Sequence, residues 1–390
     1  MDWQGEPATA RAAHLACNFG GEIMVKATKQ SSTNICIQDP EWDDSRYLLE
    51  EILVAAKGAS SGVGAFAFAS AAGINLLLKD LDFAKFLSKA PFELVVGIDA
   101  ITDTNALDAL SANVALHPNL TTRVFFGSLS GSTFHPKMCW FRQFSRGTCL
   151  VGSGNLTAGG LRGNYEAFSV STLSRNEMRK SDDMWQSWSL FHAAKLLPLD
   201  DPNVRNKAKE NSRKNRILAK EQREILVEGR NGSLSVGRPK SSGAEVLIAE
   251  IPRSGTRWNQ ANFDLHTFNR YFGATPGKTQ RIILTHIDSR GTSGPQEVRP
   301  SVSVKSHNYR FELDAAANLD YPTEGRPIAI FVKVATRTFR YRLLLPGTLI
   351  HSAASKFLDR EGTEKVGHVR RFVTDIDRVR RTAFFRKLAD

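Results

Sequence analysis

Residues 133–168 hold the most informative motif of the sequence, which begins with Thr133-Phe134-His135-Pro136-Lys137. After a spacer it continues as Cys149-Leu-Val-Gly-Ser-Gly-Asn-Leu-Thr-Ala-Gly-Gly-Leu-Arg-Gly-Asn-Tyr-Glu-Ala-Phe168. His135 and Lys137 are two residues apart in a segment of alternating character, so on a strand both side chains point to one face. A glycine-rich turn after a second short strand then offers Ser153 and Asn155. The sequence predicts a polar cluster set in an apolar sheet.

These residue types suit phosphodiester chemistry. A phosphate ester anion must be neutralised before a nucleophile approaches, and Lys137, Asn155 and Ser153 supply suitable donors without a metal. His135 can attack phosphorus, because imidazole is a nucleophile near its ordinary pKa of ~6.5. Glu166 can fix the tautomer and orientation of a histidine, as the third member of a triad does. Taken alone, His-x-Lys is a sparse motif, and a hydrogen-bonded structural histidine is the alternative.

Three segments in order resemble the signature of the phospholipase D superfamily: His135-x-Lys137, Gly152-Ser-Gly-Asn-Leu-Thr157 and Asn164-Tyr-Glu166. More narrowly, they resemble the branch that holds a small bacterial nuclease and metal-independent restriction endonucleases. The resemblance implies a phosphohistidine intermediate, with lysine and asparagine gripping the phosphate, in an active site built from two motif copies. The superfamily's usual aspartate is missing, since Arg142 occupies that region. The nuclease branch uses a downstream glutamate, which Glu166 matches, so this departure favours a nuclease over a lipase.

The chain carries one copy of the motif. His192 precedes Ala-Ala-Lys195, and His286, His307 and His351 have no lysine two residues on. One half-site per chain implies a homodimer, in which a two-fold axis brings two His135 residues together, one as nucleophile and one as general acid. Such a composite site cuts one strand at a time.

The amino-acid composition indicates which class of molecule the protein binds. The net charge is +12 and the isoelectric point about 9.6, which favours nucleic acid or an anionic membrane. Four cysteines without Cys-x-x-Cys spacing suggest neither a zinc site nor a disulfide framework, and a reducing cytoplasm fits. Residues 1–44 do not look like a signal peptide, and the apolar stretch 63–78 is too short to span a membrane. We expect a cytoplasmic protein that needs no metal or other cofactor.

Residues 1–200 predict an α/β phospholipase D-like sheet domain covered by helices. Helices are expected at 47–56, 75–89 and 104–116, and strands at 63–68, 92–98, 122–126, around His135-Pro-Lys137 and at 149–151. A further helix, 175–197, carries Met184, Trp185, Trp188 and Phe191 on one side. Core packing explains this aromatic stripe better than base stacking does.

Beyond residue 200 the composition changes twice. Residues 201–240 predict a charged linker with one exposed helix. Residues 241–390 predict a mainly β pseudobarrel with strands at 245–251, 281–285, 301–305, 309–313, 328–334 and 339–345 and a helix at 263–272. The arginine-rich tail, 366–390, is predicted to be a packed helix with a basic outer face, which adds salt-sensitive backbone affinity.

Residues 250–263 and 306–313 resemble the C-terminal domains of the same restriction endonucleases, which look like the plant B-three DNA-binding pseudobarrel. The resemblance implies two arms in the major groove, here 253–260 and roughly 303–310. Arginine pairs with guanine, and asparagine or glutamine with adenine. Alternatively, Trp258 and Tyr309 are core residues and the arginines contact phosphate only. The candidate DNA-binding residues are Arg253, Arg257, Trp258, Asn259, Gln260, Lys305, Ser306, His307, Asn308 and Arg310.

The sequence therefore predicts a dimeric, metal-independent restriction endonuclease that cleaves double-stranded DNA at specific sites. Three alternatives remain open. A lipid-hydrolysing phospholipase D shares the site but leaves the basic C-terminal region unexplained. A nuclease subunit can depend on a separate helicase, and a non-catalytic DNA-binding protein keeps the barrel without needing His135.

Overall fold

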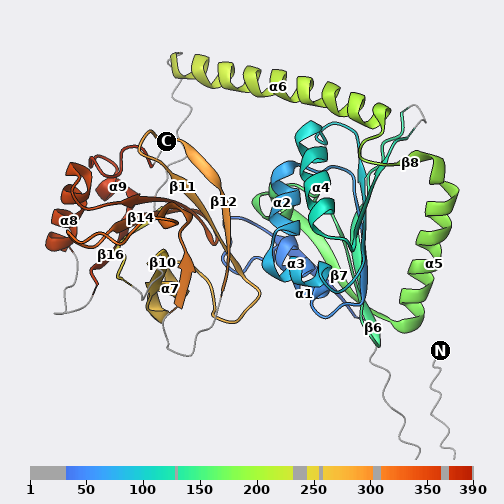
Figure 1. The fold of residues 1–390 in the computed structure, drawn as a ribbon, viewed down its shortest axis with the longest axis horizontal. Coiled ribbons are helices and arrows are strands. Elements are labelled where there is room, and N and C mark those ends of the chain that lie inside the picture. Colours follow the sequence, from blue (N-terminus) through green and yellow to red (C-terminus); the bar gives the residue numbers. More distant parts are fainter. Residues whose placement is uncertain are drawn as a thin grey trace, which may run out of the picture. The chain divides into compact units, whose positions relative to one another are not determined.

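The computed structural model describes residues 32–127, 131–231, 244–253, 258–301, 309–361 and 369–388, with backbone alone for 218–231. Ser31–Asp390 form one compact unit, which holds an eight-stranded sheet, a six-stranded sheet and a separate pair of strands (Figure 1). Mixed α/β structure was expected for the first half of the chain and mainly β structure for the second, and both are found.

The eight-stranded sheet has the order β1-β7-β6-β5-β2-β3-β4-β8. β2, β3 and β4 run parallel, whereas β5, β6, β7 and β1 alternate in direction. Phe66 pairs with Lys137, and Gly152 with Phe168, so the ends of β2 and β6 meet the starts of β5 and β7 at one sheet edge. The strands are β1 Ser32–Gln38, β2 Ser61–Phe66, β3 Phe92–Gly97, β4 Leu120–Phe125, β5 Lys137–Arg142, β6 Arg146–Gly152, β7 Glu166–Ser174 and β8 Leu196–Leu197.

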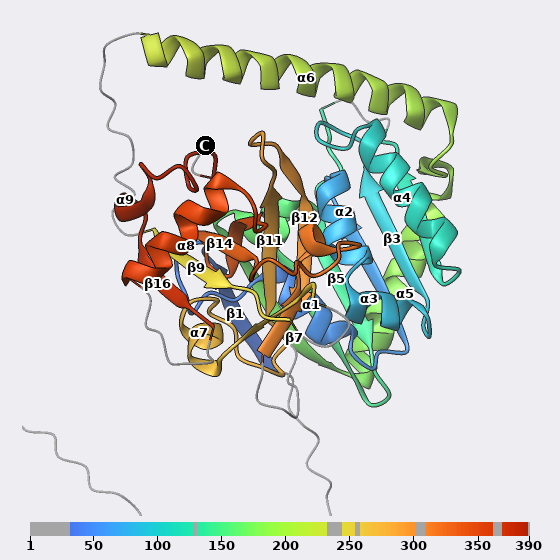
Figure 2. The same ribbon diagram turned by 60° about the vertical axis from the view of Figure 1, so that its left-hand side comes forward.

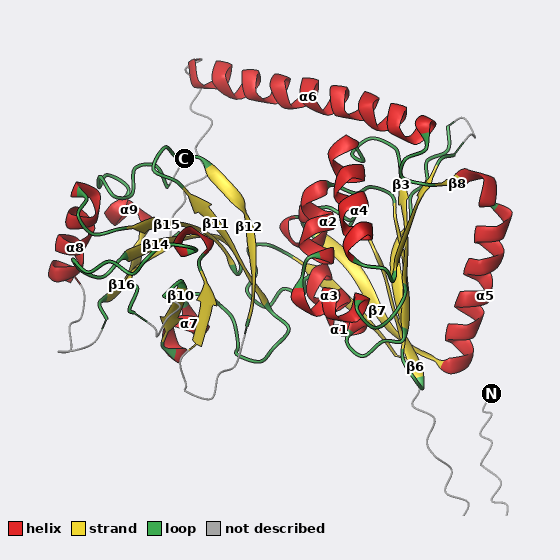
Figure 3. Cartoon of the chain, in the orientation of Figure 1, coloured by secondary structure: helices red, strands yellow, loops and turns green. Residues whose placement is uncertain are grey.

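Helices cover both faces of this sheet, as expected. α1 Leu48–Ala56, α2 Ala71–Leu78, α3 Leu81–Leu87 and α4 Thr104–Leu116 lie on one face, and α5 Arg175–Phe191 lies on the other (Figures 1 and 3). Successive side chains of β5 point to opposite faces of the sheet. Phe141 therefore packs into the core beneath α1–α4, whereas Trp140 packs beneath α5. α5 begins with a capping box between Ser174 and Glu177.

The single helix predicted at 75–89 is wrong. Asp80 interrupts it, since its side chain accepts a hydrogen bond from Asp82 N and caps α3. The same carboxylate binds Arg281 from the second half of the chain, at 2.7 Å from Nε. The break therefore depends on a distant partner that helical periodicity does not reveal.

The charged segment after residue 200 is a helix, α6 Pro202–Asn231, but its first turns are not exposed as predicted. Val204 and Ala208 are buried against the first core. Asn211 donates to Ile98 O at 2.6 Å and to Thr102 O at 2.8 Å. This part of the predicted linker is thus docked on the N-terminal half.

The six-stranded sheet has the order β12-β11-β15-β14-β9-β16, and it is antiparallel except between β11 and β15. α8 and α9 pack beside β14 and β16 (Figure 2). The likeness to a B-three pseudobarrel stays a prediction. The elements are β9 Glu245–Glu250, β10 Gln260–Phe263, β11 Arg281–Ile287, β12 Ser293–Pro300, β13 Tyr309–Glu312, β14 Ile328–Ala335, β15 Thr338–Leu344, β16 Arg371–Asp375, α7 Leu265–Arg270, α8 Leu349–Glu361 and α9 Ile376–Val379.

Two expectations for this half are wrong, and a third is not tested. The untested one is the strand expected at 301–305, which lies outside the described residues except for Ser301. The helix expected at 263–272 begins later, because Phe263 belongs to β10. The tail is not one helix, since Arg371–Asp375 pair with β9 as β16.

Candidate active site

His135 and Lys137 lie together at the sheet edge described above. His135 is exposed and just precedes β5, which begins at Lys137. Lys137 Nζ lies 3.0 Å from His135 Nδ1 and 3.1 Å from Nε2. The ring of Phe68 packs against the imidazole at 5.8 Å between centroids. Since an ammonium group only donates, it can bond only a ring nitrogen that carries a lone pair, which is the nitrogen a nucleophile uses.

The pKa of Lys137 lies below its ordinary value. Partial burial of the ammonium group is the main cause, and the negative charge of Glu166 opposes it. The charges of Lys137 and Glu166 therefore interact, although the two residues belong to different strands, β5 and β7. The ionisation of Lys137 therefore depends on the charge of Glu166.

Asn155 lies in the turn after β6, with its amide oriented by the backbone. Its Oδ1 accepts a hydrogen bond from Phe68 N at 3.3 Å. Because that N–H can only donate, the oxygen must face it, and the Nδ2 group is left to donate elsewhere. The turn requires glycine: a Cβ at Gly160 would lie 2.4 Å from Asn155 O, and one at Gly152 would lie 2.3 Å from Phe168 Cβ.

Glu166 begins β7 and accepts hydrogen bonds from Ser153 Oγ and from Asn164 Nδ2, the latter at 3.2 Å. Ser153 Oγ in turn accepts from Ala167 N at 3.0 Å. Within the described part of the chain the hydrogen-bond partners of Glu166 are thus Ser153 and Asn164 rather than His135. The structure brings all five predicted residues to one edge, but it places Glu166 beside Ser153 and Lys137.

Sequence reasoning missed Gln38, which holds the turn in place. Its Nε2 lies 3.3 Å from Gly159 O, 3.2 Å from Gly160 O and 3.0 Å from Asn164 O, while its Oε1 accepts from Leu48 N at 3.0 Å. Gln38 ends β1, a strand that was not predicted. The β-branched residues Thr33, Ile35 and Ile37 were the available signal, whereas hydrophobic alternation gave none, because Ile35 and Ile37 are exposed and Gln38 is buried.

The predicted DNA-binding residues fall into three groups. Arg257, Lys305, Ser306, His307 and Asn308 lie outside the described residues. Arg253 is exposed, and Asn259, Gln260 and Arg310 are half-buried. Trp258 is buried, and its Nε1 donates to Leu319 O at 2.5 Å. β10 pairs with β13, from Gln260 with Glu312 to Phe263 with Tyr309, so the ends of the two predicted arms lie side by side.

No family model and no curated protein matches the sequence. Similar solved structures include NucT from Helicobacter pylori (10% identity, TM-score 0.31, 43% of this chain and 99% of that chain). They also include Nuc, a phospholipase D family member from Salmonella typhimurium (15%, TM-score 0.31, 43% and 97%). A third is the N-terminal domain of Helicobacter pylori LlaJI.R1 (9%, TM-score 0.24, 33% and 97%). Similarities this weak do not themselves assign a function to this chain.

Membrane-spanning helices and metal-binding clusters are both absent from the described residues. None of the helices there is both long and apolar enough to cross a bilayer. Those residues also contain no cluster of three or more His, Cys, Asp or Glu side chains placed to hold a metal ion. The donors gathered around His135 are instead an ammonium group, an amide and a hydroxyl.

Proposed function

We propose that this chain is a metal-independent nuclease that cleaves phosphodiester bonds through a phosphohistidine intermediate on His135. One observation carries the proposal: Lys137 Nζ lies 3.0 Å from His135 Nδ1 at the same sheet edge that holds Asn155. A nucleophile and two donors for phosphate oxygens therefore converge on one open place. Glu166 and Ser153 line its other side.

The reaction needs an exchange of partners when substrate binds. The phosphate draws the Lys137 ammonium from the imidazole, and Lys137 and the Asn155 amide then hold the non-bridging oxygens. A nitrogen of His135 attacks phosphorus in line with the leaving oxygen, which takes a proton from a general acid as its bond to phosphorus breaks. Water next attacks phosphorus, gives up a proton to the same group and breaks the bond to His135.

The general acid is assigned to His135 of a second copy of the chain. Since the exposed His135 lies at an open sheet edge, a two-fold axis beside it brings two such edges together. Glu166 then balances the charge of Lys137, and Ser153 fixes Glu166. The dimer has one composite site, which cuts one strand at a time.

The C-terminal half is assigned to DNA recognition, which makes the protein a restriction-type endonuclease on double-stranded DNA. The pairing of β10 with β13 supports this assignment, because it anchors both predicted arms on one small platform. Arg253 and Arg310 lie at the described ends of these arms. We assign 1–200 to cleavage, 201–240 to the connection and 241–390 to recognition, so a cut at a fixed offset from the recognised bases is expected.

The decisive test is cleavage in the presence of EDTA. Purified protein is incubated with mixed plasmid and phage DNA, beside a His135→Ala variant, and the ends are mapped. Discrete fragments from the unmodified chain alone support the proposal. Intact DNA from both samples contradicts it as a stand-alone enzyme, and adding an ATP-driven helicase or a phospholipid substrate then separates the two alternatives.

A further inference from the structure

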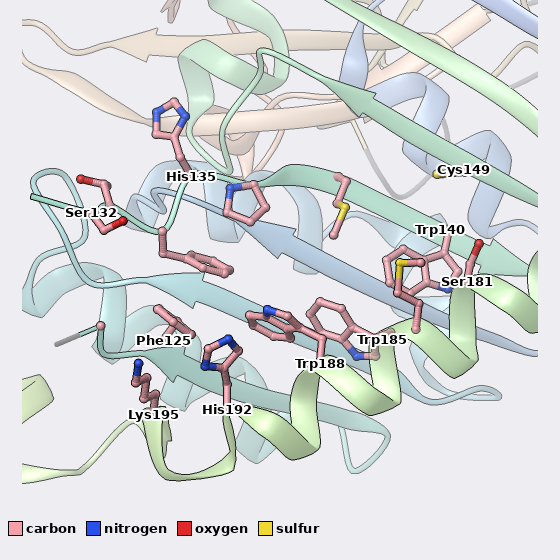
Figure 4. Close-up of a pocket in the computed structure, with 16 residues that line it drawn as sticks. Phe125, Ser132, His135, Trp140, Cys149, Ser181, Trp185, Trp188, His192 and Lys195 are labelled. Carbon is pink, nitrogen blue, oxygen red and sulfur yellow. The ribbon is translucent and has the colours of Figure 1, made fainter. Parts of the chain in front are cut away.

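A cavity of about 580 Å³ lies between α5 and the sheet, beside His135, and it is larger than core packing leaves. Its size and its lining, in which aromatic side chains stand beside a few polar ones, are those of a ligand site. Figure 4 shows Phe125, Trp188 and Trp185 along its floor, with His192 and Lys195 at one end. We refer to it as the aromatic groove, lined by Phe125, Phe134, Met138, Trp140, Trp185, Trp188, His192 and Lys195.

Phe134, Phe125 and Trp188 form a cluster of three rings in the aromatic groove. Phe134 and Phe125 stack at 4.6 Å between centroids, Phe125 and Trp188 at 5.7 Å, and Phe134 and Trp188 lie 6.0 Å apart. Trp185 stacks on Trp188 at 4.9 Å. His192 lies beside the cluster, 5.1 Å from Trp188 and 5.5 Å from Phe125. Ring faces that such a cluster leaves uncovered can stack on another flat ring.

Core packing accounts for only part of this aromatic stripe. Trp185 and Trp140 are buried, and their indole N–H groups bond Glu93 and Asp182, each at 3.0 Å. Phe125, Phe134 and Trp188, in contrast, are only half-buried. The expectation that core packing explains the stripe is therefore correct for Trp185, but it is wrong for Met184 and Phe191, which are highly exposed. Trp188 keeps surface available to a ligand.

The charged side chains of the aromatic groove favour an anionic ligand, and its rings favour a ligand that carries flat rings. The described lining includes His135, His192 and Lys195 but no carboxylate. Nucleic acid combines phosphates with aromatic bases, and proteins that bind single strands use the same pairing of aromatic side chains and cations. A purely apolar protein partner would leave His192 and Lys195 without a counterpart.

Position links the aromatic groove to the nuclease site. Phe134 lines the groove and His135 follows it directly, and the imidazole points away from the ring cluster (Figure 4). A strand that crosses this edge can thus present a phosphate to His135 while a base one or two nucleotides away lies on Phe134 and Trp188. Resting on the proposed function, we infer that the aromatic groove binds an unpaired nucleobase next to the scissile phosphate.

A binding experiment on the full-length His135→Ala protein tests this inference without hydrolysis. The probes are a fluorescent oligothymidylate of about twelve nucleotides and an abasic oligomer of equal length and charge. Fluorescence anisotropy should show that the oligothymidylate binds about 10- to 100-fold more tightly, because only it can stack. Equal affinity for both probes overturns the inference.

Substitutions then locate the stacking. In the His135→Ala background, Trp188→Ala should weaken oligothymidylate binding about tenfold and leave abasic binding unchanged, whereas Trp188→Phe should retain most of the preference. Leu190→Ala and Phe144→Ala are controls, since both side chains are highly exposed and neither lines the groove. If Trp188→Ala instead weakens both probes equally and sedimentation shows dissociation of a dimer, the groove is a protein contact and the inference fails.

Failure of the inference and failure of the proposed nuclease can be told apart. A preference for bases that survives in a protein without cleavage activity leaves the groove as a binding site and removes the catalytic proposal. Cleavage in EDTA without any preference for bases removes the inference about the groove and leaves the proposed nuclease in place.

Discussion

The Glu50 carboxylate accepts a hydrogen bond from the Arg162 guanidinium at 2.6 Å, and both side chains are buried. Glu50 lies on α1, whereas Arg162 lies in the short π-helical turn Gly159–Gly163, which follows Asn155. Arg337, from the turn between β14 and β15, binds the same carboxylate at 3.1 Å. Both guanidinium groups also lie over the ring of Tyr47. One carboxylate thus joins the turn Gly159–Gly163 to the C-terminal half.

Glu50→Ala should destabilise the protein by about 3–5 kcal/mol, because it leaves two buried guanidinium groups without their counter-ion. The free energy of unfolding from urea titration is the measurement. Asp108→Ala is the matched control: Asp108 binds Arg205 at 2.6 Å but is exposed, so its loss should cost less than about 1 kcal/mol. Similar losses for both variants would contradict a dominant buried network.

His135→Ala should reduce the cleavage rate at least about 10⁴-fold, because it removes the nucleophile. Lys137→Ala should reduce it about 10²- to 10³-fold through loss of a phosphate donor. The double variant should be little worse than His135→Ala, since the two residues act as a unit. His117→Ala controls for the loss of a histidine away from the site. Rates come from single-turnover cleavage of a labelled duplex, and additive losses would argue against joint action.

Activity should fall on the alkaline side at a pH below that expected for an ordinary lysine. Lys137 must be cationic to hold phosphate, it is cationic only below its pKa, and burial lowers that pKa. Glu166→Gln removes the opposing charge, so the pKa of Lys137 falls further and the alkaline limb moves to lower pH. The pH profile of kcat/KM in EDTA measures this shift, with Asp183→Asn on α5 as control. A limb that moves to higher pH in Glu166→Gln would contradict the assignment.

Gly160→Ala should abolish most cleavage activity, because its Cβ would lie 2.4 Å from the backbone oxygen of Asn155 and must displace it. We expect a destabilisation of about 1–3 kcal/mol as well. Gly163→Ala, in the same turn, is the control, since its nearest neighbour is 3.7 Å away at Ala158 O. Gly160→Ala should show a lower cleavage rate and a lower urea midpoint than Gly163→Ala. Equal values for the two variants would contradict a steric conflict at Gly160.

The sequence was sufficient to predict elements with strong local signals. The helix expected at 104–116 coincides with α4, where Asp103 caps the first turn, and the five catalytic candidates share one sheet edge. Periodicity could not predict the break at Asp80, because Arg281 lies 201 residues away. Gln38 and Arg162 were missed for the same reason: each acts through partners that only the tertiary fold brings near. Arm residues such as Arg257 and His307 lie outside the described structure, so their roles stay predictions.

The salt bridges between Arg281 and Asp80 and between Arg337 and Glu50 limit how freely the two halves can be exchanged. The side chain of Arg281 is 2% exposed, so acidic side chains rather than water balance its charge. A chimera that joins this N-terminal half to a foreign C-terminal module would leave Asp80 without Arg281, and Glu50 would keep Arg162 but lose Arg337. Exchanging the C-terminal half therefore requires that the incoming module carry arginines at both positions, or that Asp80 be replaced by a neutral residue together with it.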